Sequence, residues 1–150
     1  MIWTPRVTVA ALIYHQERYL LLVEEEDNDC LVLNQPAGHL EKNESLLQAV
    51  IRETAEETGG QLTPTSFVGI YRWQHPQHQL TFLRFCIAGT LNDPEAALHP
   101  QDKDIINVHW LSYDEILNAK TRLRSPLVLQ CIEDFKAGQH YPLEVYHDFG

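Results

Sequence analysis

The segment GHLEKNESLLQAVIRETAEETGG, residues 38–60, decides the fold and concentrates charge in one short stretch. Its charged side chains include four carboxylates and one arginine: Glu44, Arg52, Glu53, Glu56 and Glu57. The surrounding pattern is that of an amphipathic helix, and residues three and four apart on a helix share a face. Glu53, Glu56 and Glu57 are therefore expected to project together. Like charges placed in this way repel each other, so a cation is expected between them.

Carboxylate oxygens suit hard cations such as Mg²⁺ or Mn²⁺. The alternative is an acidic helix face in solvent, which is the more common origin of a glutamate run. The loop Pro36-Ala37-Gly38 before the helix, together with Arg52 and Gly59, favours the metal site over the solvated face.

The helix of this segment is expected over residues 44–58. Asn43 suits the N-cap, because its side chain accepts hydrogen bonds from the first free amides. Gly59-Gly60 suits the end of the helix. An apolar stripe is expected to pack on a sheet while the carboxylates face solvent; it consists of Leu47, Val50, Ile51 and Thr54. Glu44 lies nine residues before Glu53, so it approaches a shared ion only from the loop or the first turn.

Strands and further helices are expected on both sides of this helix. Alternating, β-branched stretches predict strands over residues 7–14, 19–24, 30–33, 66–73, 80–91 and 107–111. Residues 36–38 are expected to form a tight loop, and residues 92–103 a longer one. Ser112 and Glu115 fit a capping box for a short helix over 112–119. Pro126 suits the first turn of a helix over 125–136. The mixture predicts an α/β sandwich.

Composition bounds the classes of function. A chain of 150 residues fits one domain with a hydrophobic core. The net charge of −10 argues against nonspecific binding of nucleic acid. No apolar run is long enough to span a membrane, and the N-terminus does not read as a signal peptide. The three separated cysteines, Cys30, Cys86 and Cys131, are expected to be buried reduced thiols in a cytoplasmic protein.

The spacing of the charged segment matches a known signature. It has Gly38, five residues, Glu44, seven residues, Arg52-Glu53, two residues, Glu56-Glu57, one residue and Gly59. This pattern resembles the Nudix box, found in hydrolases that cleave a nucleoside diphosphate linked to another moiety. The two positions that are usually bulky and aliphatic hold Thr54 and Gly60. Both are packing positions, so the departure weakens the hydrophobic anchor of the loop and leaves the chemistry in place.

The resemblance extends over residues 7–149. The pieces NQPAGHLE, LRF, HWLSYDEIL, LRSPLV and GQHYPLE are similar to the NudJ-type phosphatase branch of the Nudix family. That branch is described as acting on nucleoside di- and triphosphates and on hydroxymethylpyrimidine pyrophosphate. The resemblance implies one Nudix hydrolase domain over residues 1–150, folded as an α/β/α sandwich with a mixed β-sheet.

The resemblance also implies roles for the charged segment. Glu53 and Glu57 would be direct ligands of Mg²⁺, with Mn²⁺ as the alternative ion. Glu56 would be a third ligand or hold a water molecule, and the carbonyl of Gly38 would complete the shell, since a residue without Cβ allows close approach of the main chain. Arg52 would orient a neighbouring glutamate. The alternative for Arg52 is an ordinary surface ion pair.

The general base has several candidates. Glu53 and Glu56 lie in the charged segment itself. Asp104 lies outside it, on a loop where many Nudix enzymes carry the carboxylate that activates water, and Asp102 is the alternative on the same loop. Both aspartates also suit an ordinary polar turn.

Three arginines and one histidine are candidates for contacting substrate phosphate. Arg6, Arg84 and Arg124 would neutralise its charge, and Arg84 lies in mid-strand between two apolar residues. The alternative for Arg84 is an exposed sheet face. His39, beside the expected metal loop, would donate a hydrogen bond to phosphate.

Two aromatic residues are candidates for the other end of a substrate. Trp73, with Tyr71 two residues earlier, would stack on a base or a pyrimidine ring, or would simply cover the core. His75 and His78 resemble a metal pair only superficially. Prolines and glutamines surround them, which indicates a solvated loop.

These observations predict a Mg²⁺-dependent Nudix hydrolase. It would cleave phosphoanhydride bonds of nucleoside tri- and diphosphates and of hydroxymethylpyrimidine pyrophosphate, releasing phosphate. Its expected partners are small-molecule nucleotides or pyrimidine pyrophosphates, without nucleic acid or membrane, and it would be a monomer or homodimer. One alternative is a pyrophosphatase of nucleotide sugars or ADP-ribose. Another is a non-catalytic Nudix-type nucleotide sensor, although such domains typically lose carboxylates that this chain keeps.

Overall fold

A computed structural model describes residues 1–26 and 30–150. Its strands are β1 (Arg6–His15), β2 (Arg18–Glu26), β3 (Cys30–Asn34), β4 (Ala37–His39), β5 (Leu62–Gln74), β6 (Thr81–Leu91) and β7 (Ile105–Ser112). Its helices are α1 (Leu46–Thr58), α2 (Tyr113–Asn118) and α3 (Pro126–Lys136), with short 3₁₀ turns at Lys120–Arg122 and Leu143–Val145. Within these residues, no helix is both long enough and apolar enough to cross a membrane.

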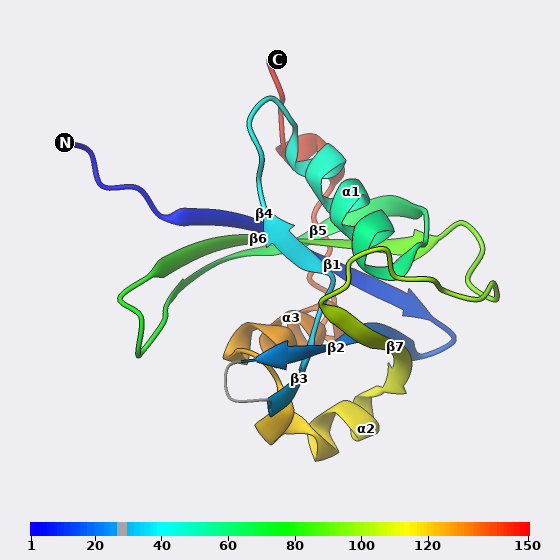
Figure 1. Ribbon diagram of the computed structural model, residues 1–150. Coiled ribbons are helices and arrows are strands. Elements are labelled where there is room, and N and C mark those ends of the chain that lie inside the picture. Colours follow the sequence, from blue (N-terminus) through cyan, green and yellow to red (C-terminus); the bar gives the residue numbers. More distant parts are fainter. Residues whose placement is uncertain (27–29) are drawn as a thin grey trace.

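The sheet is mixed, which confirms the predicted fold class. Its strands follow the order β3-β2-β1-β6-β5, with β4 paired to β1 and β7 paired to β2. The pairing of β1 with β6 is parallel, whereas the other strand pairs are antiparallel. Figure 1 shows α1 on one side of the strands and α2 and α3 on the other. The short β4 lies beside α1, so residues before the helix and residues on it come together.

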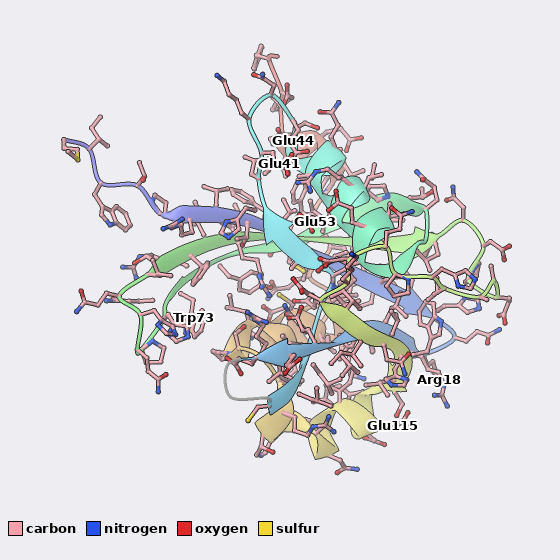
Figure 2. All side chains as sticks on the ribbon, in the orientation of Figure 1. Arg18, Glu41, Glu44, Glu53, Trp73 and Glu115 are labelled. Atoms are coloured by element: carbon pink, nitrogen blue, oxygen red, sulfur yellow. The ribbon has the colours of Figure 1, made fainter. Side chains whose placement is uncertain are left out.

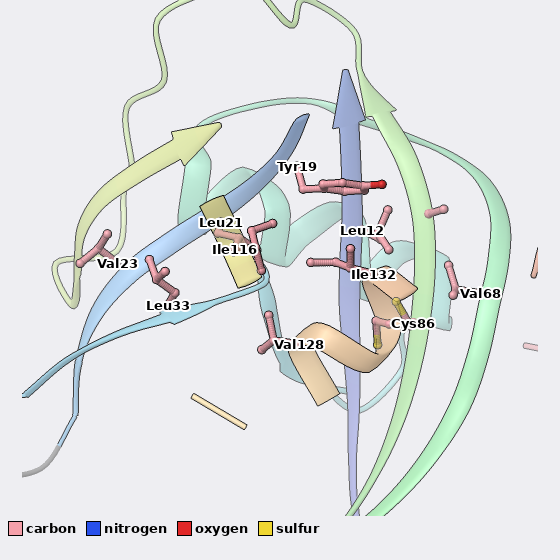
Figure 3. Close-up of a cluster of buried hydrophobic side chains, with 12 residues drawn as sticks. Leu12, Tyr19, Leu21, Val23, Leu33, Val68, Cys86, Ile116, Val128 and Ile132 are labelled. Atoms are coloured by element: carbon pink, nitrogen blue, oxygen red, sulfur yellow. The ribbon is translucent and has the colours of Figure 1, made fainter. Parts of the chain in front are cut away.

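Two apolar cores lie on opposite faces of the strands. Alternation along β1 sends Val9, Ala11 and Ile13 to the side of α1, and Leu12 to the side of α2 and α3. Figure 3 shows the core on the side of α2 and α3, in which Leu12 lies near Ile132 of α3. Helix α1 is thus held by packing along one side, which leaves its other sides to carry charge.

Helix α1 begins two residues later than predicted. Asn43 has a left-handed φ of 68°, so it is not the N-cap. Ser45 takes that position and forms a capping box with Gln48, in which the amide of Gln48 donates to Ser45 Oγ at 3.1 Å. The helix ends at Gly59, which has a left-handed φ of 78°, as the sequence predicts. Glu44 therefore lies in the loop before the helix.

The apolar stripe of α1 is also shifted from the prediction. Val50 and Thr54 are buried as expected, but Leu46 and Ala49 are buried rather than Leu47 and Ile51, which are partly exposed. Glu57 is buried as well. The prediction placed the carboxylates on the side of the helix away from the apolar stripe. Because the buried stripe lies elsewhere than predicted, Glu57 faces the protein interior.

Several other predictions are confirmed or corrected. The capping box of α2 and the position of Pro126 in the first turn of α3 are confirmed. The expected loop over residues 36–38 is wrong, because Ala37 and Gly38 belong to β4. Cys86 and Cys131 are buried free thiols as expected, whereas Cys30 is exposed.

Candidate active site

Strand β4 brings the backbone against two glutamates of α1. The amide of Ala37 donates a hydrogen bond of 2.7 Å to Glu57 Oε1. Gly38 faces Glu53 so closely that a Cβ at this position would lie 2.2 Å from Cδ and from Oε1 of Glu53. With Glu53 in this position, only a residue without a side chain fits between strand and carboxylate, and a larger one would displace the carboxylate. The two glutamates therefore meet the chain at two consecutive backbone positions.

Glu57 is a buried carboxyl group with 6% of its surface exposed. Burial raises its pKa to about 9, and the charges of Glu53, Glu24 and Asp102 act in the same direction, against the opposing effect of the Ala37 amide. Burial also raises the pKa of Glu53. Burial therefore disfavours the charged form of both groups, at Glu53 in spite of its contact with Arg52, and a further cation would favour that form.

Arg52 connects the loop before α1 to the helix. Its guanidinium forms a two-point contact with Glu44, with Nε 3.0 Å from Oε2 and Nη2 2.7 Å from Oε1. Its Nη1 donates to Glu53 Oε1 at 2.8 Å, and its Nη2 to the carbonyl of His39 at 3.2 Å. The hydrogen bonds from Arg52 lower the pKa of Glu44. Glu44 thus fixes Arg52, which in turn orients Glu53.

The three glutamates of the helix differ in exposure, although Arg52 Nη1 lies 2.8 Å from Glu53 Oε1 and 3.4 Å from Glu56 Oε2. The side chain of Glu56 is 47% exposed and that of Glu53 is 13% exposed, whereas Glu57 is buried beside β4. Figure 2 labels Glu41, Glu44 and Glu53 along the preceding loop and the flank of α1. In the described residues, no group of three or more His, Cys, Asp or Glu side chains is arranged to hold a metal ion.

The donor set nevertheless fits a hard divalent ion. Glu53 and Glu57 supply carboxylate oxygens at neighbouring positions of β4, and the Cβ missing at Gly38 leaves space beside one of them. Because the pKa of Glu57 is raised, a cation would compete with a proton at this group. At Glu53 the cation would compete with Arg52, which donates a hydrogen bond to its carboxylate.

The two loop aspartates differ in their relation to Glu57. The amides of Gln101 and Asp102 donate to the carbonyl of Glu56 at 2.9 and 3.0 Å, which fixes this loop to the last turns of α1. The charge of Asp102 contributes to the raised pKa of Glu57. Asp102 Oδ1 also accepts the amide of Asp104 at 2.9 Å. The sequence analysis named Asp104 as the candidate and Asp102 as its alternative.

The substrate-side candidates are divided between two places. Arg6 pairs with Phe82, which pairs with Trp73, and the rings of Trp73 and Phe82 stack with centroids 5.9 Å apart. Arg84 lies on the same face of the sheet, two residues further along β6 than Phe82. It pairs across the strands with Thr8 of β1, which in turn pairs with His39 of β4. Arg124 lies apart from these rows and forms an ion pair of 2.9 Å with Glu24.

Three polar residues of the site escaped the sequence analysis. Glu24 is buried and accepts hydrogen bonds from Asn34 Nδ2 and Arg124 Nη1, both at 2.9 Å. Gln35 is 1% exposed, and its Oε1 accepts Arg84 Nη1 at 3.1 Å. The available signal was the polar pair Asn34-Gln35 directly after an apolar strand and before Pro36.

Comparison with known proteins gives one consistent result. A family model described as the NUDIX domain matches residues 4–130. The protein named Phosphatase NudJ of Escherichia coli (strain K12) is 44% identical over 145 residues, covering 97% of this chain and 92% of the relative. A protein of the same name from Shigella flexneri matches to the same extent.

Solved structures agree with the sequence relatives. A NUDIX hydrolase from Nitrosomonas europaea is 43% identical, with a TM-score of 0.90 and coverage of 97% of this chain and 98% of that chain. The NUDIX domain of Shewanella oneidensis NrtR, solved with ADP ribose, is 19% identical with a TM-score of 0.72, covering 91% of this chain and 89% of that chain. The second similarity concerns the fold alone.

Proposed function

The chain belongs to the Nudix hydrolase family, and from this premise we propose that it is a Mg²⁺-dependent phosphatase of small organic di- and triphosphates. Nucleoside tri- and diphosphates and hydroxymethylpyrimidine pyrophosphate are the proposed substrates, with inorganic phosphate among the products. The observation that carries the proposal is the contact of Glu53 and Glu57 with consecutive residues of β4. The relatives named as phosphatases support the type of product.

Nudix hydrolases depend in general on divalent metal ions, and Mg²⁺ is the proposed ion here. Glu53, Glu57 and the carbonyl of Gly38 would hold it, and Glu56 would add a water-mediated contact. When bound, such an ion neutralises phosphate oxygens and lowers the pKa of a nearby water molecule. Arg52 would keep Glu53 turned toward β4 through the hydrogen bond of 2.8 Å.

A carboxylate near Glu57 would accept the proton of the attacking water. Asp102 is the proposed base ahead of Asp104, because its charge acts on Glu57 and its amide is fixed to the carbonyl of Glu56. Arg84 and His39 would contact phosphate, and Trp73 would cover the organic ring, with Arg6 at the outer end of the same row. Arg124 would act through Glu24, with which it is paired.

Product analysis with a panel of compounds tests this proposal. Purified protein with Mg²⁺ is expected to release phosphate from a nucleoside triphosphate, a nucleoside diphosphate and hydroxymethylpyrimidine pyrophosphate. Two monophosphates formed from ADP-ribose or a nucleotide sugar, without phosphate release from the first group, would indicate a pyrophosphatase instead. Nucleotide binding without turnover at any Mg²⁺ or Mn²⁺ concentration would indicate a sensor domain.

A further inference from the structure

One row of side chains crosses four neighbouring strands. Thr8 of β1 pairs with His39 of β4 and with Arg84 of β6, which pairs with Tyr71 of β5. Residues paired across neighbouring strands project to the same face of a sheet. By alternation along β1, this is the face of Leu12, opposite to the face on which α1 packs. The row begins at β4, the strand that contacts the box glutamates.

Two buried polar atoms of this row have no partner. Thr8 is 7% exposed, and its Oγ1 is buried without a hydrogen bond. Arg84 Nε is buried without a hydrogen bond as well, so the row contains two of the four such side-chain atoms in the described residues. Buried polar atoms in native proteins are nearly always satisfied, by protein, water or ligand. Two unsatisfied donors on directly paired residues indicate a group that binds between them.

The charge of Arg84 indicates what that group is. Among residues 1–26 and 30–150, no carboxylate lies within ion-pair distance of its guanidinium. Glu24, whose Oε1 accepts hydrogen bonds from Arg124 and Asn34, acts on Arg84 only through space. The hydrogen-bond acceptor that Arg84 has is the neutral amide of Gln35. A partly desolvated cation without a counter-ion favours an anionic ligand.

The next row outward adds a recognition element for a planar ring. Arg6, Phe82 and Trp73 form this row, and the rings of Trp73 and Phe82 are stacked at an angle of 23° between their planes. Figure 2 shows Trp73 toward the end of the sheet that lies away from α1. An aromatic shelf beside an anion site matches a molecule in which a diphosphate carries a heterocyclic ring.

We propose that Thr8 Oγ1 and Arg84 Nε form a subsite that binds one phosphate oxygen of the substrate, and that the neighbouring row of Trp73 and Phe82 selects ring-bearing organic pyrophosphates over inorganic pyrophosphate. The inference rests on the proposed function, since it names the substrate contacts of the same site. Thr8 contacts substrate in this assignment, and Gln35 is a positioning residue that holds the guanidinium.

A pair of hydroxyl deletions tests the subsite. Thr8→Val removes an unsatisfied buried hydroxyl, so the variant should melt at the same temperature as the wild type or higher. Its affinity for a non-hydrolysable α,β-methylene nucleoside diphosphate, measured by calorimetry with Mg²⁺, should fall about tenfold, as expected for loss of a hydrogen bond to a charged group. Its preference for nucleoside diphosphate over inorganic pyrophosphate should stay unchanged, because both carry the phosphate oxygen, whereas Trp73→Ala should lower that preference.

Ser66→Ala is the matched control. Ser66 Oγ is also buried without a partner, and Ser66 pairs with Ala88, which pairs with Leu12, two positions deeper on the same face. This variant should melt at the wild-type temperature or higher and should bind the analogue as the wild type does. Equal affinities of Thr8→Val and Ser66→Ala for the analogue would overturn the subsite.

The binding experiment is independent of turnover. A wild type that releases no phosphate from any organic pyrophosphate would overturn the proposed function, and the affinities of the two variants would still decide the subsite. A wild type that does not bind the analogue would overturn the subsite itself. An active wild type with an unaffected Thr8→Val variant would overturn the subsite alone.

Discussion

Gly38 and Glu53 are in direct contact across the interface between β4 and α1, and a methyl group on Gly38 would lie 2.2 Å from the carboxyl carbon of Glu53. The contact links a glycine of the box to a glutamate fifteen positions later. It explains in physical terms why this position excludes a side chain: the strand approaches the carboxylate at the point where the proposed ion would be held.

Replacing this glycine should inactivate the enzyme while leaving it folded. In Gly38→Ala the new methyl group would displace the carboxylate of Glu53, so we expect kcat to fall more than about 100-fold, beyond the typical 10–100-fold effect of supporting residues. Gly138→Ala is the control. Its φ of 91° makes alanine costly by about 1 kcal/mol, but no atom lies within 4 Å of the added Cβ. Equal activities of the two variants would refute the role of Gly38.

Neutralising Glu57 should abolish turnover without unfolding the protein. Because its pKa is raised to about 9, the carboxyl group carries a proton at neutral pH when no cation is bound, and glutamine has nearly the same shape and charge. Glu57→Gln should therefore keep the Tm of the metal-free protein and lose more than about 100-fold in kcat. Glu144→Gln, an exposed glutamate, should retain activity. A fully active Glu57→Gln enzyme would contradict the assignment.

The same variant should lose its response to Mg²⁺. A ligand present at 100 times its Kd stabilises a protein by about 2.7 kcal/mol. For a chain of this size, this corresponds to a rise in Tm of roughly 5–10 °C. Differential scanning fluorimetry with and without Mg²⁺ should show this rise in the wild type and a much smaller one in Glu57→Gln. An equal rise in both proteins would place the ion elsewhere.

Glu44 and Arg52 should act as one unit. Lysine lacks the planar fork that contacts both oxygens of Glu44, so Arg52→Lys should lower kcat about 10–100-fold, and Glu44→Gln should do the same. The double variant should be no worse than either single variant, because each change breaks the same chain of contacts to Glu53. Losses that multiply in the double variant would mean that Glu44 acts on the ion or substrate directly.

Asp102 and Asp104 should differ in their effect on activity. Asp102→Asn removes the negative charge that acts on Glu57, whereas Asp104, exposed like Asp102, lies two residues further along the loop. We expect kcat to fall about 10²–10⁴-fold in Asp102→Asn, the usual contribution of a general base, and little in Asp104→Asn. A larger loss of kcat in Asp104→Asn than in Asp102→Asn would indicate that Asp104 is the base.

The sequence predicted those features that depend on local spacing. The glutamate and glycine positions of the box, the end of α1 at Gly59 and the capping box of α2 follow from residues close together in the chain. The longer strands were predicted from their apolar residues, and β1 alternates between the two apolar cores, whereas the short β4 was predicted as a loop. Family membership followed from the spaced box residues, because they agree at several positions at once.

The remainder depends on contacts between distant residues. Asn43 was predicted as the N-cap because its side chain suits that role, but its backbone has a left-handed φ and Ser45 caps the helix through its contacts with Gln48. The burial of Glu57 follows from the rotation of α1 against the sheet, which helix periodicity alone did not give. Gln35 is a hydrogen-bond partner of Arg84 because the fold brings it beside β6, a contact that the sequence does not indicate.

Anomalous scattering from Mn²⁺ tests the central claim most directly. Crystals grown with Mn²⁺ and a non-hydrolysable pyrophosphate analogue should show an anomalous peak bounded by Glu53, Glu57 and the carbonyl of Gly38. In that state, Glu57 should be deprotonated, its proton released to solvent and replaced by the ion. A peak elsewhere, or both glutamates still bound only to Arg52 and to the Ala37 amide in an enzyme that turns over with Mn²⁺, would contradict the account.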